Sequence, residues 1–335
     1  MHDAVRAKCA ANVTPRKSVT KNGKVSIFVA SYNRRNFLRE SLDSLLQQTY
    51  ENAEIIVVDD GSTDGAAMVV AEYAGRHREK IVPVIKKRNK GLPDSLNIAF
   101  NLSKESEYLA FHADDDKWRP DKLEEQLAVL KKNKDIGLVH SDAELIDSDS
   151  NRMEKLFSEK YAHHSKRDEP NITKKIFLYG NYICAPSVIV RRDALNAFGN
   201  EMPYNVKLIT DCYMWLVISS KYRFYYLDEP LVEYRVSPHS VQTTMPDRMR
   251  WETYSIRARA YNRIGSVREK VEQEEANNCL SRIARDNARH YASEGRWLPM
   301  LQSAAAMYRL NHNYREVKSL ILTTYQRMTK RTQMS

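Results

Sequence analysis

Short apolar runs alternate with longer segments of helical period between Lys24 and Ser141. The runs place valine, isoleucine and leucine in succession, which is typical of strands buried on both faces of a parallel sheet. Helical segments between such strands predict βαβ units. The predicted strands are Val25–Ala30, Glu54–Val58, Ile81–Ile85, Tyr108–His112 and Ile136–Ser141, and the predicted helices are Asn36–Gln48, Asp64–Gly75, Leu92–Leu102 and Pro120–Lys131.

The pattern beyond Ser141 is less regular. A polar excursion lies around Ser158–Pro170, and the chain reads as helical from about Pro246 to Met328. We therefore expect an α/β domain with a mostly parallel sheet over residues 24–241, a basic tail over residues 1–23 and a helical, basic region over residues 242–335. The later predicted strands are Ser187–Arg191, Arg223–Leu227 and Leu231–Arg235, with a helix at Asp211–Lys221.

The composition and the apolar pattern indicate in which cellular compartment the protein is expected. The chain of 335 residues has four cysteines without a CxxC pair, which argues against a zinc knuckle or a redox motif. No stretch reaches the ~18 continuous apolar residues of a membrane span. The polar N-terminus lacks the apolar core of a signal peptide. These features favour a reduced, cytoplasmic location.

Positive charge is concentrated at the two ends of the chain. Residues 241–335 carry 17 Lys and Arg against nine Asp and Glu, whereas residues 25–240 carry 30 against 33. Basic ends favour anionic membranes or polymers, and a solvated helical surface is the alternative. Apolar residues at helical spacing within Arg315–Arg331 predict a peripheral position on the inner face of a membrane. Packing of this stripe on the α/β domain is the alternative, and no nucleic-acid partner is expected.

Polar loops follow three of the predicted strands. Ligands of open α/β sheets bind beyond the carboxyl ends of the strands, which indicates the loops Ser31–Arg34, Asp59–Asp64 and Ala113–Trp118. In the second loop, a carboxylate at the strand end can accept a hydrogen bond from a base N–H or a ribose hydroxyl. Turn chemistry is the alternative there, with Asp64 capping the next helix.

The third loop carries three adjacent carboxylates, Asp114, Asp115 and Asp116. Such neighbours repel one another unless something offsets their charge. Mg²⁺ or Mn²⁺ would do so, because hard cations prefer carboxylate and diphosphate oxygens. The alternative is that Asp116 caps a helix beginning near Pro120, and this is compatible with Asp115 as a metal ligand.

Two weaker features lie nearby. Tyr32 at a strand end can stack on a base, although a core tyrosine fits equally well. The segment Lys86–Gly91 places four cations before a helix, which suits a diphosphate or a solvated turn. The chain has no Walker motif and no GxGxxG after the first strand, which weighs against P-loop and dinucleotide-binding folds.

Five segments of the sequence are informative through their order along the chain. They are VSIFVASYN at Val25–Asn33, VVDDGSTD at Val57–Asp64, Asp114-Asp115 with Trp118 and Pro120, TDCYMW at Thr210–Trp215, and LVEYR at Leu231–Arg235. This order resembles the family 2 glycosyltransferases with a GT-A fold. TDCYMW is similar to that family's E-D-x-x-x-W segment, and LVEYR to a late strand. The resemblance covers about residues 24–241.

The resemblance implies transfer of a sugar from a nucleotide-diphospho-sugar, with UDP as the expected nucleotide, to the hydroxyl of a saccharide, lipid-linked or other acceptor. It implies inversion, and a role in making polysaccharides, glycolipids or glycoconjugates. Residues 24–142 would bind the donor and residues 143–241 the acceptor. Asp211 would be the base, or a simple helix N-cap. Asp115 would bind Mn²⁺ or Mg²⁺, and the donor nucleotide would lie against Ser31, Tyr32, Asn33, Asp59, Asp60, Lys90 and Asp114.

The chain departs from the family pattern at three positions. Ala113 stands where many members have a carboxylate, Thr210 stands for the usual Glu, and Ser237 stands where a His often follows. His239 is close by and is a candidate for the acceptor or the diphosphate, with a surface histidine as the alternative. Arg235 is a second such candidate, and pairing with a structural carboxylate is its alternative.

Two other classes of protein stay open at this stage. A metal-dependent nucleotidyltransferase would also use carboxylates at strand ends, but its Gly-rich loop after the first strand is missing. A non-catalytic, family-like binding subunit is kept open by Ala113 and Thr210, whereas Asp115 and Asp211 count against it.

Overall fold

The computed structural model describes residues 22–161, 171–199, 202–203, 206–237, 246–294, 296–311, 318 and 322. His239 and nearly all of the Arg315–Arg331 stripe lie outside these residues, as does the basic tail up to residue 21. The predictions made for them are therefore not tested.

A single twisted sheet forms the centre of the described chain, in the order β3-β2-β1-β4-β8-β6-β9-β5, with β7 paired to β6. Strands β1 to β4 are all parallel. Strand β8 runs antiparallel to β4 and β6, and β9 runs parallel to β6. The bounds are β1 Val25–Ser31, β2 Ala53–Asp59, β3 Ile81–Ile85, β4 Tyr108–Ala113, β5 Lys117–Trp118, β6 Ile136–Ile146, β7 Arg152–Leu156, β8 Ile189–Arg191 and β9 Arg223–Arg235.

The α/β fold predicted from the apolar pattern is confirmed. Up to Ser141 the predicted ends differ from the observed ones by at most two residues, except that β6 continues to Ile146. The two late strands predicted around residues 223–235 form the single strand β9. Ser141 of β6 pairs with Leu227 of β9, whereas the next residue of β6, Asp142, pairs with Pro230. The extra residues form a bulge, so the turn-like sequence Asp228-Glu229-Pro230 bends the strand without ending it.

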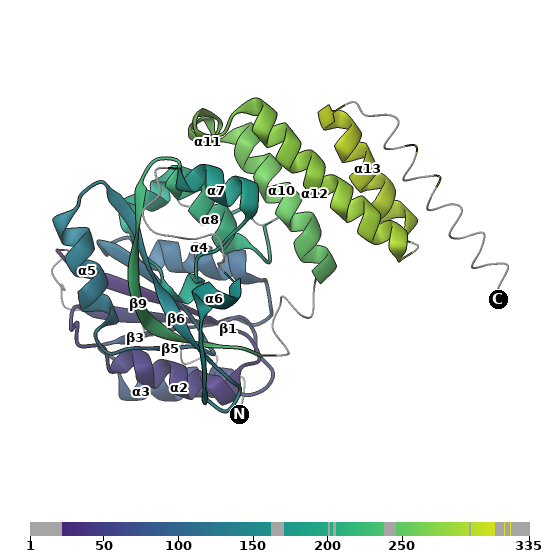
Figure 1. Ribbon diagram of the computed structural model, residues 1–335. Coiled ribbons are helices and arrows are strands. Elements are labelled where there is room, and N and C mark those ends of the chain that lie inside the picture. The colour runs from purple at the N-terminus through teal and green to yellow at the C-terminus, as the bar shows by residue number, and fades with distance from the viewer. Residues whose placement is uncertain are drawn as a thin grey trace, which may run out of the picture.

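Helices cover both faces of the sheet (Figure 1). One face packs against α2 Arg35–Leu46, α3 Ala66–Arg76 and α5 Lys122–Lys132, and the other against α4 Leu92–Leu102, α7 Ile172–Tyr179 and α8 Thr210–Ser219. Both faces need a cover because successive side chains of a strand point to opposite faces of the sheet, and β1 is an example. Val25, Ile27 and Val29 join the first core, and Phe28 joins the second.

The helical region follows as α10 Pro246–Arg263, α11 Gly265–Lys270, α12 Gln273–Ser293 and α13 Trp297–Asn311. Ile256, Cys279 and Leu280 belong to the same core cluster as Trp215 of α8. Helices α10 to α12 therefore extend the second face of the α/β body (Figure 1). Shorter helices are α6 Phe157–Tyr161, η1 Ala185–Ser187 and η2 Arg192–Phe198. Within the described residues, no helix combines the length and apolarity needed to cross a bilayer.

Candidate functional site

A cavity of about 1120 Å³ opens beyond the carboxyl ends of β1 and β4. It is the place that the sheet topology predicts for a ligand. Among the residues predicted from the sequence, the cavity is lined by Ser31, Tyr32, Asn33, Asp60, Lys90, Asp114, Asp115 and Asp211. Asp59 and Arg235 do not line it.

The first two loops are joined to each other through Asn33. Asn33 adopts a left-handed φ of 54°, which asparagine tolerates better than most residues. Its N–H donates to Ser62 Oγ at 2.9 Å, and its Oδ1 accepts the N–H of Thr63 at 2.8 Å. This fixes the neighbouring Tyr32 at the cavity wall with 46% of its surface exposed, so Tyr32 is not a core tyrosine.

Asp59 and Asp60 have different surroundings. Asp59 is fully buried, and its Oδ2 accepts the N–H of Ser62 at 3.1 Å. Asp60 lines the cavity, and its two oxygens accept the N–H groups of Lys90 and Gly91 at 2.8 Å each. Lys86 Nζ adds an ion pair to Asp60 at 2.9 Å. Asp60 thereby anchors residues 86–91, the basic loop. Residues 87–90 of this loop are exposed, as the alternative of a solvated turn expects.

Gly61 makes the approach of the basic loop possible. A Cβ on Gly61 would lie 2.5 Å from the backbone carbon of Arg88, and its φ of +76° is unfavourable for other residues. Asp64 precedes Gly65, the N-cap of α3, and its Oδ1 accepts the N–H of Ala66, the first residue of that helix. Its Oδ2 accepts the N–H of Arg35 at the start of α2.

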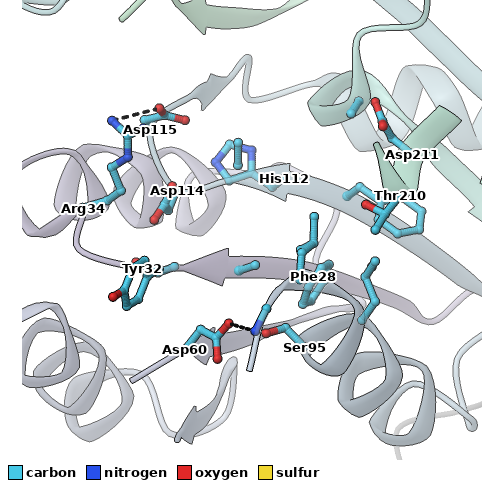
Figure 2. A pocket seen from close by; sticks show the side chains of 18 of the residues that line it. Phe28, Tyr32, Arg34, Asp60, Ser95, His112, Asp114, Asp115, Thr210 and Asp211 are labelled. Atoms are coloured by element: carbon cyan, nitrogen blue, oxygen red, sulfur yellow. Dashed lines mark hydrogen bonds and ion pairs between the residues drawn. The ribbon is translucent and has the colours of Figure 1, made fainter. Parts of the chain in front are cut away.

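Asp114 and Asp115 face the cavity at the end of β4 (Figure 2). Burial, together with the neighbouring Asp115 carboxylate, raises the pKa of Asp114. Asp114 Oδ2 is buried and has no hydrogen-bond partner among the described residues. Arg34 Nη1 lies 3.8 Å from Asp115 Oδ2. An unpartnered carboxylate oxygen beside a second carboxylate fits a hard cation.

No group of three or more His, Cys, Asp or Glu side chains in the described residues is arranged to hold a metal. Asp114 and Asp115 alone supply too few ligands for a protein-only site. The residues present fit an ion that completes its coordination with diphosphate oxygens and water, as Mg²⁺ commonly does.

Asp116 does not cap a helix, so that expectation is wrong. Its Oδ1 accepts the N–H of Arg235 at 2.7 Å, and α5 begins only at Lys122. The reason is that β5 intervenes, because Lys117 and Trp118 pair with Glu233 and Val232 of β9.

Asp211 lies across the cavity from Tyr32 and Asp60 (Figure 2). It sits in the first turn of α8, whose N-cap is Ile209, so the N-cap alternative for Asp211 is wrong. The helix begins one residue earlier than predicted, at Thr210. Asn181 Nδ2 donates to Asp211 Oδ2 at 2.7 Å. Burial raises the pKa of Asp211, and hydrogen bonds from the backbone N–H groups of Cys212 and Asp211, together with the bond from Asn181, partly offset this.

Arg235 is a structural residue, which agrees with its alternative interpretation. Its side chain is 1% exposed and pairs with Glu40 Oε2 at 3.1 Å. Its Nε donates to the carbonyl of Asp115 at 2.8 Å, and its Nη1 to the carbonyl of Asp147 at 2.9 Å. The guanidinium thus holds the carboxylate loop against the β6–β7 turn and does not reach the cavity.

Several lining residues had no sequence signal of their own. Lys207 and Leu208 precede Asp211, and Arg248 comes from α10 of the helical region. His112 could have been noticed as a polar residue within an apolar strand. Its Nε2 lies 2.8 Å from Ser41 Oγ, and burial lowers the pKa of His112 to about 3, so the ring is neutral.

Comparison with known proteins agrees with this geometry. The family model described as "Glycosyl transferase family 2" matches residues 26–199. An uncharacterized glycosyltransferase of Rickettsia typhi is 31% identical over 236 residues, which span 68% of each chain. The putative teichuronic acid biosynthesis glycosyltransferase TuaG of Bacillus subtilis is 28% identical over 65% of this chain and 81% of its own.

Two solved structures share the fold. TarS of S. aureus, crystallised with UDP, superposes with a TM-score of 0.61 at 16% identity, covering 92% of both chains. The mannosyltransferase PcManGT of Pyrobaculum calidifontis, in complex with GDP-Man and Mn²⁺, gives a TM-score of 0.51 at 15% identity and covers 97% of this chain and 92% of its own. The chain belongs to the family 2 glycosyltransferases and has their GT-A fold. It is therefore an enzyme of the glycosyltransferase class.

Proposed function

We propose that the enzyme transfers a sugar from a UDP-sugar to an acceptor hydroxyl by direct displacement with inversion. One observation carries the proposal: a single cavity holds a carboxylate pair, Asp114 and Asp115, on one side and the separate carboxylate Asp211 on the other. A donor bound between them would present its anomeric carbon to an acceptor activated by Asp211.

The donor nucleotide would occupy the side formed by the loops after β1 and β2 and by the basic loop. The exposed ring of Tyr32 is available to stack on the base, and Ser31 and Asn33 lie beside it on the same wall. Asp60 acts mainly through the basic loop, because its oxygens already hold the N–H groups of Lys90 and Gly91. Lys90, with a side chain 53% exposed, is then placed for the diphosphate. TarS, which shares the fold, was crystallised with UDP, and this supports the choice of nucleotide.

Asp114 and Asp115 would hold a divalent cation, Mn²⁺ or Mg²⁺, together with the diphosphate. When bound, such an ion neutralises the charge that develops on the leaving diphosphate. Arg34, close to Asp115, is placed to add positive charge at the same point. The PcManGT structure contains Mn²⁺, which supports a manganese ion here.

Asp211 would accept the proton of the acceptor hydroxyl. As the acceptor oxygen bonds to the anomeric carbon, the bond from that carbon to the diphosphate oxygen breaks, and its electron pair leaves with UDP. Asp211 is suited to this role because it lies in the first turn of α8, where a helix stabilises negative charge. Relatives such as TuaG support a role in polysaccharide or glycoconjugate synthesis.

A panel of UDP-sugars incubated with the enzyme and Mn²⁺ tests the proposal. Release of UDP from at least one donor, abolished by chelation of the metal, is the expected result. Release of pyrophosphate from a nucleoside triphosphate would instead identify a nucleotidyltransferase. Absence of turnover with every donor and with a range of saccharide acceptors would favour a binding subunit.

A further inference from the structure

Two separate segments flank Asp211, and helices of the C-terminal region hold both of them. The first is the end of α7 with the residues after it, 176–181, and the second is the loop 206–209. We propose that the helical region positions the catalytic base, with Glu252 and Arg257 of α10 as the positioning residues. This inference rests on the role proposed for Asp211.

Glu252 fixes the loop that leads into α8. Its carboxylate is buried, with 6% of the residue exposed. Oε2 accepts the backbone N–H of Lys207 at 3.0 Å and that of Leu208 at 2.7 Å. Oε1 lies 3.5 Å from Arg248 Nε, one turn earlier on α10. A buried carboxylate oxygen that accepts two backbone N–H groups satisfies both of these donors. Glu252 therefore clamps the chain three residues before Asp211, in a loop that lines the cavity.

Arg257 and its neighbours fix the other flanking segment. The last carbonyls of a helix lack partners within it and attract cations. At the end of α7, Arg257 Nε donates to the carbonyl of Phe177 at 2.5 Å, and Arg282 Nη2 of α12 donates to that of Leu178 at 2.7 Å. Gly180 follows with a φ of +108°, and a Cβ on it would lie 3.3 Å from Arg257 Nη2. Asn181, the next residue, donates to Asp211.

The bonds of Glu252 and those of Arg257 and Arg282 both act on the position of the Asp211 carboxylate. The former set the path of the backbone that enters α8, and the latter set the side chain that hydrogen-bonds Asp211 Oδ2. The clamping residues all lie more than 40 residues beyond Asp211 in the sequence. The donor side depends on different bonds, between the loops after β1 and β2 and the basic loop. Loosening the Glu252 clamp is therefore expected to affect transfer and to spare donor binding.

The test compares Glu252→Ala and Glu252→Gln with Glu269→Ala, a change of an exposed glutamate on α11. UDP affinity in Mn²⁺, the rate of UDP release at saturating UDP-sugar, and hydrogen exchange of the Lys207 and Leu208 amides are measured on the full chain. For Glu252→Ala we expect unchanged UDP affinity, faster exchange of the two amides, and a rate lower by about tenfold or more, as misplacement of a catalytic group produces. Glutamine retains one acceptor oxygen, so Glu252→Gln should lose less, and Glu269→Ala should match the native enzyme.

Three results would overturn the inference: an unchanged rate in Glu252→Ala, unchanged exchange of both amides, or a parallel loss of UDP affinity and rate. If Glu252→Ala does not fold, Glu252→Gln and Arg257→Lys carry the same comparison. Asp211→Asn separates this outcome from failure of the proposed function. A folded Asp211→Asn variant that still transfers sugar refutes the base itself. An inactive one beside a fully active Glu252→Ala refutes only the clamp.

Discussion

The two sides of the cavity are built in different ways. The donor side comes from consecutive loops after β1, β2, β3 and β4, and the first three of these loops hydrogen-bond to one another through Asn33 and Asp60. The transfer side brings together Asn181, Asp211 and Arg248, which are separated in sequence and held by helices of the C-terminal region. The donor side is thus a property of the parallel half of the sheet, whereas the transfer side depends on how the rest of the chain packs against it.

The largest expected effect is on the transfer side. In Asp211→Asn the rate of transfer should fall by a factor on the order of 10² or more, because asparagine cannot accept the proton. An asparagine Oδ1 can still accept the hydrogen bond from Asn181, so the melting temperature should change little. UDP affinity should persist, since the nucleotide contacts lie on other loops. Rate, UDP affinity and melting temperature are measured on the same preparation. Transfer at the native rate by this variant would place the base elsewhere.

The matching change on the donor side is Asp115→Ala. It removes one of the two carboxylates available to a cation that also needs diphosphate oxygens. UDP affinity in Mn²⁺ should fall by about tenfold or more and lose its dependence on the metal. Calorimetric titration of UDP with and without Mn²⁺ measures both. If the variant kept the native affinity and the native metal dependence, Asp115 would not be a ligand.

Tyr32 should have a smaller effect, confined to donor binding. Stacking of an aromatic ring on a base contributes about 1–3 kcal/mol, and Tyr32 is exposed at the cavity wall. Tyr32→Ala should weaken UDP binding by about that amount, and Tyr32→Phe should retain it because the ring remains. The rate at saturating donor should be nearly native in both. A similar loss in the phenylalanine variant would show that the hydroxyl, and not the ring, makes the contact.

The same contrast explains how much the sequence could predict. Local period and turn chemistry sufficed for the parallel half, and therefore for the loops that carry Tyr32, Asp60 and Asp114. They did not distinguish Asp59, the buried last residue of β2, from Asp60, which follows it and lines the cavity. Arg235 looked like a site residue, since its partners at Glu40 and Asp115 become neighbours only through the β5–β9 pairing.

The transfer side shows more clearly which features could not be predicted from the sequence. Asp211 was found through a motif, whereas Asn181 and Arg248 carry no motif. Tertiary packing brings Asn181 to Asp211 and Arg248 to the cavity wall. Lys207 and Leu208, in the loop before α8, line the cavity and carry no motif either. The feature that fixes them, Glu252, lies in a segment whose sequence predicts only helix. No pattern within one segment can indicate a bond to another segment 45 residues away.

The smallest effect expected is a shift in pH dependence when Asn181 is replaced. Burial raises the pKa of Asp211, and the bond from Asn181 favours the ionised form and partly offsets this. In Asn181→Ala the pKa of Asp211 should rise further, so the acid limb of the pH–rate profile should move to higher pH. The loss of rate should then be greater on the acid limb of the profile than on its plateau. Asn101→Ala, a change of an exposed asparagine on α4, is the control.

The same pKa shift of Asp211 also determines how the stability of the fold depends on pH. A folded-state pKa above the unfolded value means that the native state binds the proton more tightly, so this group stabilises the fold at low pH and loses that contribution as pH rises through its pKa. Profiles of rate and of melting temperature against pH, recorded for both variants, measure the two effects. An acid limb that stays in place in Asn181→Ala would mean that this hydrogen bond does not tune the base, and that the two sides of the cavity differ less in their dependence on packing than the structure indicates.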